Sequence, residues 1–424
     1  MSHRRLLVGI AWLACEGIAL SQSGFQLRNG DRVVFYGDSI TEQQHYTQIV
    51  ETYVATRYPR LDVTFINSGW GGDTVKGGGG GSVDLRLQRD VISYHPTLVT
   101  IMLGMNDGSY QPENETADKV YFDGYRHIVS SIQSALPGIR ITAIEPSAYD
   151  DVTRPQDFPG GYNETLVSFS KWLKNFGAQT GLTVVDMNTP VVDTLKKATQ
   201  LDAEKAQQLL PDRVHPGFAM SLVMAEALLK AWGGRRAVTA VTIDASEGKP
   251  KVVSSQYTQI SDLGGNGAIH WTEKDDALPL PFAQWSRMWG GELTPFVLKS
   301  ADVTNEINSE PLQVNGLKNG VYALKVDGNT IGTFNNDELA HGVNLAILDT
   351  PMSKQAKEVY DLIAEHCDVH YFRWRTVEVP LANYNLTAAQ PTMENADSLE
   401  KELMQKRSTI AQPKSHVFAL VPIS

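Results

Sequence analysis

The sequence predicts an α/β fold with a parallel sheet, followed by a smaller β-rich module and C-terminal helices. Up to about residue 235, apolar runs of strand length alternate with segments of helical periodicity. Such alternation implies crossover connections, which give parallel strands covered by helices on both faces. After Gly233-Gly234 short β-rich runs replace the alternation, and helical spacing returns from Pro351.

The strands of the first half are read from short apolar runs, and the helices from apolar residues three and four positions apart. The predicted strands cover residues 32–36, 63–66, 98–103, 139–144 and 182–185. The predicted helices cover residues 41–58, 120–136, 166–176 and 218–232. The run of five glycines from Gly77 to Gly81 is interpreted as a flexible surface loop.

The second half reads as an antiparallel module and two helices. Lys318-Asn319-Gly320 and Asp327-Gly328-Asn329 are typical hairpin turns. The predicted strands are 241–245, 251–255, 269–272, 296–299, 312–317 and 321–326, and the predicted helices are 351–367 and 396–412. These patterns divide the chain into a signal peptide (1–25), an α/β domain (26–235), a β-rich accessory module (236–350) and a helical C-terminal region (351–424).

Composition bounds the classes of function. The chain has 424 residues, 42% of them hydrophobic, so it can bury a large core, and with only 2 cysteines it needs no disulfide framework. Because 37 Lys and Arg face 48 Asp and Glu, the net charge is -11, which disfavours nucleic acid and anionic membrane surfaces as partners. No run reaches the roughly 20 apolar residues needed to span a membrane. The oligomeric state stays open.

The N-terminus reads as a secretory signal. Met1 to Arg5 are positively charged, Leu6 to Cys15 are apolar, and small residues follow near Ala19. This pattern predicts a secreted or periplasmic protein. Trp12-Leu13-Ala14-Cys15 is similar to a bacterial lipoprotein cleavage site except for its Trp, so lipid anchoring is the minor alternative.

Two segments could supply a nucleophile and its base. Gly37-Asp38-Ser39 follows the first strand and precedes a helix, so Ser39 is either an ordinary N-cap or a nucleophile at the ligand-binding edge of the sheet. Asp212-Arg213-Val214-His215 offers a histidine as base and a carboxylate to orient it, although both residues could also belong to a surface turn.

Two further segments open onto the same edge of the sheet. Residues 67–74 follow the second strand and are rich in glycine, and Gly104-Met105-Asn106-Asp107 follows the third. A glycine lets a main-chain N–H approach a substrate closely, and the Asn106 amide is a donor that stays neutral at any pH. Each segment taken alone is also compatible with a plain turn.

Together the four segments resemble the blocks of the SGNH hydrolases, also called the GDSL esterases and lipases, over about residues 28–235. The resemblance implies a three-layer, flavodoxin-like fold. It implies a serine ester hydrolase in which Ser39 is the nucleophile, His215 the base and Asp212 the acid. The oxyanion hole would then comprise Ser39, Gly72 and Asn106. No cofactor is implied.

Substrate identity rests on context. A carbohydrate O-acetylesterase is favoured by the secretory signal, the expected exposed aromatics Trp70 and Tyr149, and the polar loop 145–151. Further candidate substrate-binding residues are Asp38, Trp70, Asp107 and Tyr149. The alternatives are a short-chain aryl or lipid esterase, a thioesterase, and a non-catalytic carbohydrate-binding protein. The expected partner is thus a small acyl ester or an acylated carbohydrate.

No metal site is predicted. His366 and His370 are four residues apart at the end of an amphipathic helix, but a third ligand is missing nearby in the sequence. The pair and the intervening Cys367 are therefore interpreted as structural.

Overall fold

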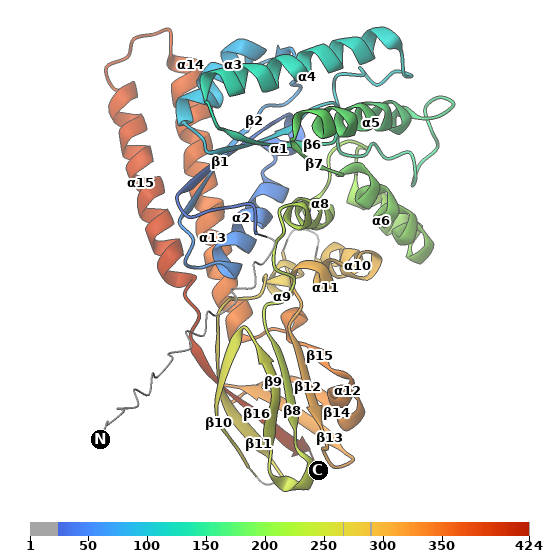
Figure 1. The fold of residues 1–424 in the computed structure, drawn as a ribbon, viewed down its shortest axis with the longest axis vertical. Helices are drawn as coiled ribbons and strands as arrows, with labels where there is room; N and C mark the ends of the chain where they lie inside the picture. Colours follow the sequence, from blue (N-terminus) through green and yellow to red (C-terminus); the bar gives the residue numbers. More distant parts are fainter. Residues whose placement is uncertain (1–23, 266, 289–290, 424) are drawn as a thin grey trace, which may run out of the picture.

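A computed structural model describes residues 24–265, 267–288 and 291–423 (Figure 1). The predicted signal peptide falls almost entirely outside these residues. Within them, no helix is both long enough and apolar enough to cross a lipid bilayer.

The first half is built on the predicted parallel sheet. Its five strands run in the order β2-β1-β5-β6-β7, and each neighbouring pair is parallel. They are β1 (Asp31–Gly37), β2 (Val63–Gly69), β5 (Leu98–Met102), β6 (Arg140–Ile144) and β7 (Thr183–Val185). The α/β fold class predicted from the alternating pattern is confirmed.

Helices cover both faces of this sheet, which gives the expected three layers (Figure 1). On one face lie α3 (Val83–Asp90), α4 (Glu115–Ala135) and α5 (Tyr162–Thr180), and on the other lie α2 (His45–Arg57) and α8 (Phe218–Ala231). The edge is completed by α1 (Ser39–Glu42), α6 (Asn188–Leu201) and α7 (Ala203–Leu209). The single helix predicted over 41–58 is divided, because Gln44 adopts a left-handed conformation with φ of 64°.

The glycine run is a tight hairpin and not the flexible surface loop we expected. Its strands β3 (Gly77–Gly78) and β4 (Gly81–Ser82) pair antiparallel. A Cβ atom at Gly80 would lie 2.6 Å from Trp70 Cδ2 and 2.7 Å from Arg86 Cδ, so only glycine allows this close packing. The hairpin therefore supports the loop that carries Trp70.

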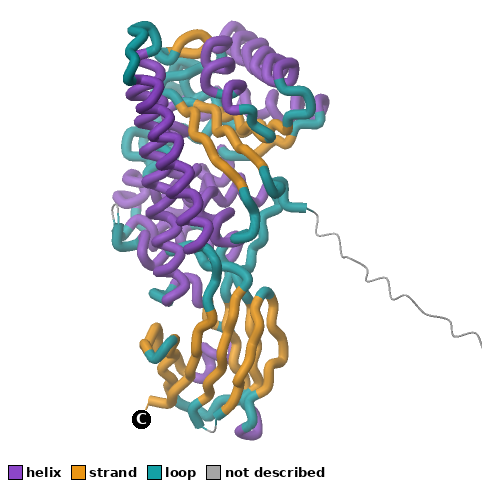
Figure 2. The backbone as a smooth tube through the Cα atoms, turned by 90° about the vertical axis from the view of Figure 1, so that its left-hand side faces the viewer, coloured by secondary structure: helices purple, strands orange, loops and turns teal. Residues whose placement is uncertain are grey.

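The module consists of two sheets that share one core (Figure 2). One sheet has the order β15-β12-β8-β9, and the other β10-β11-β16-β13-β14. The strands are β8 (Ala240–Asp244), β9 (Lys251–Gln256), β10 (Thr258–Gly264), β11 (Ile269–Asp275), β12 (Pro311–Asn315), β13 (Val321–Val326), β14 (Asn329–Asn335), β15 (Val343–Asn344) and β16 (Ser415–Ile423). Pairing is antiparallel except between β8 and β12.

Short helices lie between the module and the first half: α9 (Phe282–Trp285), α10 (Leu293–Ser300) and α11 (Val303–Ile307). Another short helix, α12 (Asn336–His341), lies within the module and packs on β12 and β14. The strand predicted at 296–299 was wrong, since these residues belong to α10. Phe296, Val297 and Ser300 are buried at helical spacing, and this spacing outweighs the β preference of valine and phenylalanine.

The C-terminal residues form a helical hairpin that runs along the first half and returns to the module (Figures 1 and 2). We call Pro351–Ile410 the C-terminal hairpin. It contains α13 (Pro351–Tyr371), the π-helix η4 (Phe372–Glu378), α14 (Val379–Leu381) and α15 (Ala389–Ile410). The chain then ends in β16, between β11 and β13, within a region that the sequence placed as helical.

Candidate active site

Ser39 lies where the sheet predicts a ligand site. It is the first residue of α1, directly after β1, at the carboxyl edge of the parallel strands. Asp38 is the N-cap, and its Oδ1 accepts the Ile40 main-chain N–H at 2.9 Å. Burial raises the pKa of Asp38 to about 7. The capping role therefore falls to Asp38, which leaves the Ser39 hydroxyl free for other contacts.

His215 links Ser39 to Asp212. Its Nε2 lies 2.8 Å from Ser39 Oγ, and its Nδ1 lies 2.6 Å from Asp212 Oδ2. Partial burial works to raise the pKa of Asp212, but hydrogen bonds from the main chain and ring of His215 dominate and lower it. The structure thus brings the three sequence-predicted residues into one hydrogen-bonded chain.

The turn that carries His215 is held in place by Asp150 and Arg154. Arg213 has a left-handed backbone with φ of 71°, and its carbonyl accepts the Asp150 N–H at 2.9 Å. Arg154 pairs with Asp150 at 2.7 Å and donates to the carbonyls of Leu210 and Pro211. No sequence motif pointed to Arg154, because the carbonyls to which it donates lie more than 50 residues away.

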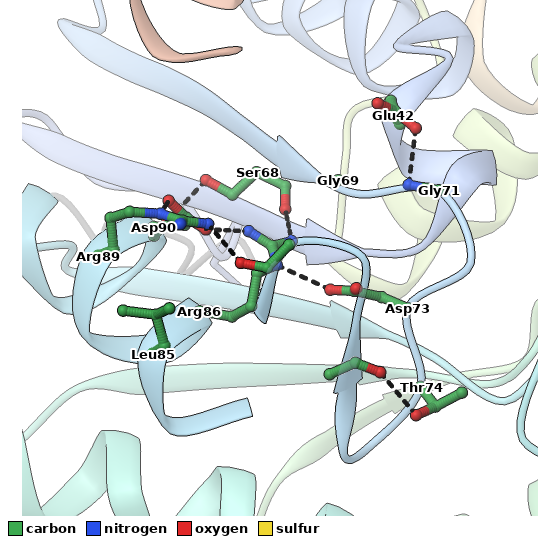
Figure 3. Close-up of polar contacts among 12 residues, drawn as sticks. Glu42, Ser68, Gly69, Gly71, Asp73, Thr74, Leu85, Arg86, Arg89 and Asp90 are labelled. Atoms are coloured by element: carbon green, nitrogen blue, oxygen red, sulfur yellow. Dashed lines mark hydrogen bonds and ion pairs between the residues drawn. The ribbon is translucent and has the colours of Figure 1, made fainter. Parts of the chain in front are cut away.

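Glycine-rich residues 69–74, which we call the oxyanion loop, approach Ser39 from β2. The Gly69 N–H donates to Asn67 Oδ1 at 3.0 Å. The Gly71 N–H donates to Glu42 Oε2 at 2.7 Å (Figure 3). Within the described residues, the Gly72 N–H has no hydrogen-bond partner. Of the three glycines, Gly72 is therefore the one whose N–H can still bind a ligand.

Asn106 presents its amide beside the same loop. Its Nδ2 donates one hydrogen to the Asp73 carbonyl at 3.0 Å, which leaves the second hydrogen available. Its Oδ1 accepts from the Tyr110 hydroxyl at 3.1 Å, which fixes the orientation of the amide. Tyr110 has a left-handed backbone with φ of 58° and a half-exposed ring. No sequence motif pointed to this tyrosine.

A buried arginine holds the loop to α3. Arg86 Nε pairs with Asp73 at 2.8 Å, its Nη2 donates to the Ser68 carbonyl at 2.7 Å, and its Nη1 pairs with Asp90 (Figure 3). The arginine and both carboxylates are fully buried. One fixed cation therefore sets the shape of the loop from beneath.

The remaining candidates for substrate contact are more enclosed than expected. Tyr149 is only 8% exposed, because its hydroxyl donates to Asp157 at 2.8 Å and its ring packs on Tyr110, so the expectation of exposure was wrong. Trp70 is partly buried against Arg375, whose guanidinium lies 3.5 Å from the ring centre. Asp107 accepts the Val75 N–H at 2.9 Å, and burial raises its pKa to about 7.

The loop after β6 also differs from expectation. Residues 145–150 are all buried, so they do not offer a sugar the polar surface that their sequence suggested. Asp150 supports the turn at residues 210–216 through its main-chain N–H and its ion pair with Arg154, whereas Glu145 pairs with Lys174.

Metal-ligating side chains gather at one place in the described residues. Glu51, His366 and Cys367 are buried, and their ligand atoms lie within 4.8 Å of one another. Glu51 already accepts from Arg407 at 2.7 Å and lies 3.1 Å from His366 Nε2. Because the Arg407 guanidinium occupies the carboxylate, we interpret the group as an ion-pair network that docks the C-terminal hairpin on α2.

Comparison with known proteins places this geometry in a family. Residues 35–220 match the GDSL-like lipase/acylhydrolase family. An acetylxylan esterase from Geobacillus stearothermophilus is 27% identical over 232 residues, which are 49% of this chain and 96% of that protein. A solved structure of an active-site mutant of an acetylxylan esterase from the same organism is 22% identical, with a TM-score of 0.41, over 50% of this chain and 97% of that chain.

A solved gut microbial diltiazem-metabolizing enzyme is similar over a larger part of the molecule. It is 25% identical, with a TM-score of 0.80, and the match covers 94% of this chain and 98% of that chain. The similarity therefore includes the module and the C-terminal hairpin. Through residues 35–220, this chain belongs to the GDSL-like lipase/acylhydrolase family and is a carboxylic ester hydrolase.

Proposed function

We propose that this protein is a serine esterase that removes acetyl or similarly small acyl groups from hydroxyl-bearing compounds. The observation that carries the proposal is the chain from Ser39 Oγ to His215 Nε2 at 2.8 Å and from His215 Nδ1 to Asp212 Oδ2 at 2.6 Å. A serine hydroxyl is a weak nucleophile until a base accepts its proton, and a carboxylate behind the base stabilises the resulting imidazolium.

The reaction proceeds in two steps. His215 takes the Ser39 proton as Oγ attacks the ester carbonyl, and then protonates the departing alcohol as the tetrahedral intermediate collapses to the acyl-enzyme. Water, deprotonated by His215, attacks the acyl-enzyme and releases the acid, and Ser39 recovers its proton.

The negative charge on the tetrahedral oxygen needs donors that already point toward it. The main-chain N–H groups of Ser39 and Gly72 and the second amide hydrogen of Asn106 fill this role in our proposal. Ser39 opens α1, so its N–H is one of the groups that a helix leaves unpaired. Replacing Asn106 by Ala should lower kcat by about 100 to 1000-fold in a folded protein, as measured by steady-state hydrolysis of 4-nitrophenyl acetate.

A carbohydrate O-acetyl ester is the substrate class that we favour. The support is the 27% identity with an acetylxylan esterase across nearly all of that protein. Similarity to a diltiazem-metabolizing enzyme over 94% of this chain favours a second candidate, an ester of a small aromatic alcohol. The half-exposed Tyr110 ring beside Asn106 is compatible with either, because both sugars and aromatic rings stack on tyrosine.

Release of the carboxylic acid, which is palmitate for 4-nitrophenyl palmitate and acetate for the other esters, discriminates between the two substrates. Acetylated xylan, diltiazem (which carries an acetate ester), 4-nitrophenyl acetate and 4-nitrophenyl palmitate would each be incubated with the wild type and with Ser39→Ala. Ser39-dependent release from xylan supports the carbohydrate esterase, and release from diltiazem alone supports the second candidate. Absence of Ser39-dependent release from all four esters would contradict the proposed function.

We also propose that the protein is exported. Support comes from the sequence of residues 1–25 alone, with its basic start and apolar run. N-terminal sequencing of protein recovered from the periplasm or medium would test this proposal, and metabolic labelling with a fatty acid would test the lipoprotein alternative at Cys15.

A further inference from the structure

The C-terminal hairpin lies outside the residues that match the family, yet its tip contacts the oxyanion loop. The tip is the π-helix η4 (Phe372–Glu378), which follows α13 without a break. Figure 1 shows that α13 and α15 carry this tip from the module to the far end of the parallel sheet, near α3. Short π-helical stretches are uncommon and often occur at functional sites.

Arg375 of η4 completes a chain of polar contacts that ends at the oxyanion loop. Its Nη1 lies 2.6 Å from Glu42 Oε1, and Glu42 Oε2 accepts the Gly71 N–H at 2.7 Å. Glu42 belongs to α1, the helix that Ser39 opens. One carboxylate thus joins the nucleophile's helix, the oxyanion loop and the C-terminal hairpin.

Stacking reinforces this contact. The Arg375 guanidinium lies 3.5 Å from the centre of the Trp70 ring, and Trp70 directly precedes Gly71. The neighbouring Trp374 donates from Nε1 to Asp90 Oδ1 at 2.7 Å, and Asp90 pairs with Arg86 beneath the loop. The tip of the hairpin therefore contacts the Trp70 ring directly. It reaches the Gly71 main chain through Glu42, and the buried Arg86 through Asp90.

We propose that Arg375 is a positioning residue for the esterase reaction, acting through Glu42 to hold the Gly71-Gly72 peptide so that the Gly72 N–H points at the developing oxyanion. This inference rests on the proposed function. Gly71 is close to the nucleophile, since a Cβ placed on it would lie 3.8 Å from Ser39 Cβ and 2.8 Å from Glu42 Oε2. The Glu42 carboxylate consequently lies beside the reacting centre.

Arg375 has a second effect at the same place. A carboxylate without a counter-ion so near to the site would repel the negative charge of the tetrahedral intermediate. The Arg375 guanidinium pairs with that carboxylate and neutralises it. Loss of Arg375 should therefore weaken binding of the transition state more than binding of the neutral ester, which lowers kcat with little change in KM.

Arg373 offers a matched control. It lies in the same π-helix, and its ion pairs with Asp397 and Glu378 stay within the C-terminal hairpin. We expect Arg375→Ala to lower kcat on 4-nitrophenyl acetate by about 10 to 100-fold, as for a small misplacement of catalytic groups, with KM changed by less than about threefold. Arg373→Ala should keep the wild-type kcat, although both variants lose ion pairs of the hairpin.

Rescue experiments separate positioning from a general loss of stability. Guanidinium at low millimolar concentration should restore part of the activity of Arg375→Ala, because Arg375 is 17% exposed and its place is open to solvent. Arg375→Lys, which keeps the charge but not the planar stacking group, should fall between wild type and Arg375→Ala. Glu42→Gln combined with Arg375→Ala should lose no more activity than Arg375→Ala alone, since the unpaired carboxylate is gone.

Ser39→Ala in the same assay distinguishes failure of this inference from failure of the proposed function. If Ser39→Ala is inactive while Arg375→Ala and Arg373→Ala have the same kcat, the positioning role is wrong and the esterase proposal stands. If Ser39→Ala retains wild-type turnover, both proposals fail. If Arg375→Ala does not fold, an intact kcat in both Arg375→Lys and Glu42→Gln overturns the inference, and reduced kcat in both supports it.

Discussion

The Tyr110 hydroxyl helps to orient the Asn106 amide. The Tyr110 O–H donates to Asn106 Oδ1 at 3.1 Å, and this contact keeps the amide nitrogen on the side of the oxyanion loop. Such a hydrogen bond contributes about 1 kcal/mol, which corresponds to roughly a fivefold change in rate. We therefore expect Tyr110→Phe to lower kcat about fivefold in steady-state hydrolysis of 4-nitrophenyl acetate.

Tyr121→Phe is the control for Tyr110→Phe. In the wild type, the Tyr121 hydroxyl donates to the Leu103 carbonyl at 3.2 Å, near the same end of β5 but away from Asn106. An equal loss of kcat in both variants would mean that Tyr110 acts only through general stability.

Gly80 tests how firmly the glycine hairpin supports the oxyanion loop. An added Cβ would overlap Trp70 and Arg86, so Gly80→Ala should cost about 1–3 kcal/mol in unfolding free energy and lower kcat as well. Gly79→Ala is the matched control, because its Cβ would meet Trp70 Nε1 at an acceptable 3.4 Å. Urea unfolding and hydrolysis of both variants would check this, and equal stability of the two would contradict the close packing.

At the scale of single residues, the sequence predicted which catalytic residues come together, but not the contacts that hold them in place. Ser39, Gly72 and Asn106 sit in short segments that follow β1, β2 and β5, so their meeting at one sheet edge follows from topology. Asp212 and His215 follow the helix α7, and their place at the site was predicted from the motif that they form. Glu42, Tyr110, Arg86 and Arg375 act through contacts between distant segments or through an unusual backbone conformation. No local pattern encodes such contacts.

The C-terminal hairpin docks on α2 through a charged network with its own pH dependence. Burial works to lower the pKa of His366, but the Glu51 carboxylate 3.1 Å away dominates and raises it well above the usual value of 6.5. Hydrogen bonds from His366 and His370 lower the pKa of Glu400 to about 2, against the effect of burial.

The signs of these shifts fix the pH window. A raised histidine pKa contributes stability that is complete below 6.5 and is lost as pH rises toward the folded-state pKa. A lowered glutamate pKa contributes stability that is complete above 4.5 and is lost as pH falls toward about 2. The network therefore stabilises the fold most between about pH 4.5 and 6.5.

We expect the thermal midpoint of the wild type to fall between pH 5.5 and pH 8.5 by more than that of His366→Gln. His127→Gln serves as the control, because His127 pairs with Asp84 at the surface. Differential scanning calorimetry at the two pH values would measure the shifts. Identical shifts in the wild type and His366→Gln would contradict the assignment of this network.

At the scale of elements, helices and strands with sustained apolar periodicity were predicted well, whereas elements judged only from the β preference of a few residues were not. The five sheet strands and the long helices α4, α8 and α13 appear near their expected positions because their apolar spacing is sustained. α10 was mistaken for a strand, and β10, β14 and β16 were missed. β10 and β14 are largely exposed, so the apolar alternation that marks a half-buried strand is weak in them.

The whole molecule is tied together where its two halves meet. The fully buried Arg57 of α2 donates to the Ile307 carbonyl at 3.1 Å and to Asn308 Oδ1 at 3.2 Å. The Leu278 N–H donates to the Thr56 carbonyl at 3.0 Å. The C-terminal hairpin leaves the module, packs along the first half and returns as the central strand β16.

We consequently expect the two halves to unfold together. Phe418→Ala removes a buried ring of β16 and should cost about 3–5 kcal/mol in unfolding free energy. Urea titrations followed by activity and by far-UV circular dichroism should give coincident transitions in the wild type and in this variant, shifted to lower urea in the variant. Activity that survives after the dichroism of the module is lost would show that the halves unfold independently.

The sequence patterns indicated that the secondary structure changes between the two halves, but they did not predict that the C-terminal strand returns to the module. The change after Gly233-Gly234 reflects local composition, whereas the return of β16 to the module depends on pairing between strands more than 80 residues apart. Pairing over such separations leaves no periodic trace in the chain.

The most direct test of the account is covalent trapping of the nucleophile. A fluorophosphonate ester reacts with a serine that is activated by a neighbouring base, and peptide mass spectrometry locates the adduct. We predict one adduct, on Ser39, in the wild type, and strongly slowed labelling in His215→Ala. An adduct on another residue, or a folded wild type that is not labelled, would contradict the assignment of Ser39, His215 and Asp212 as the catalytic chain.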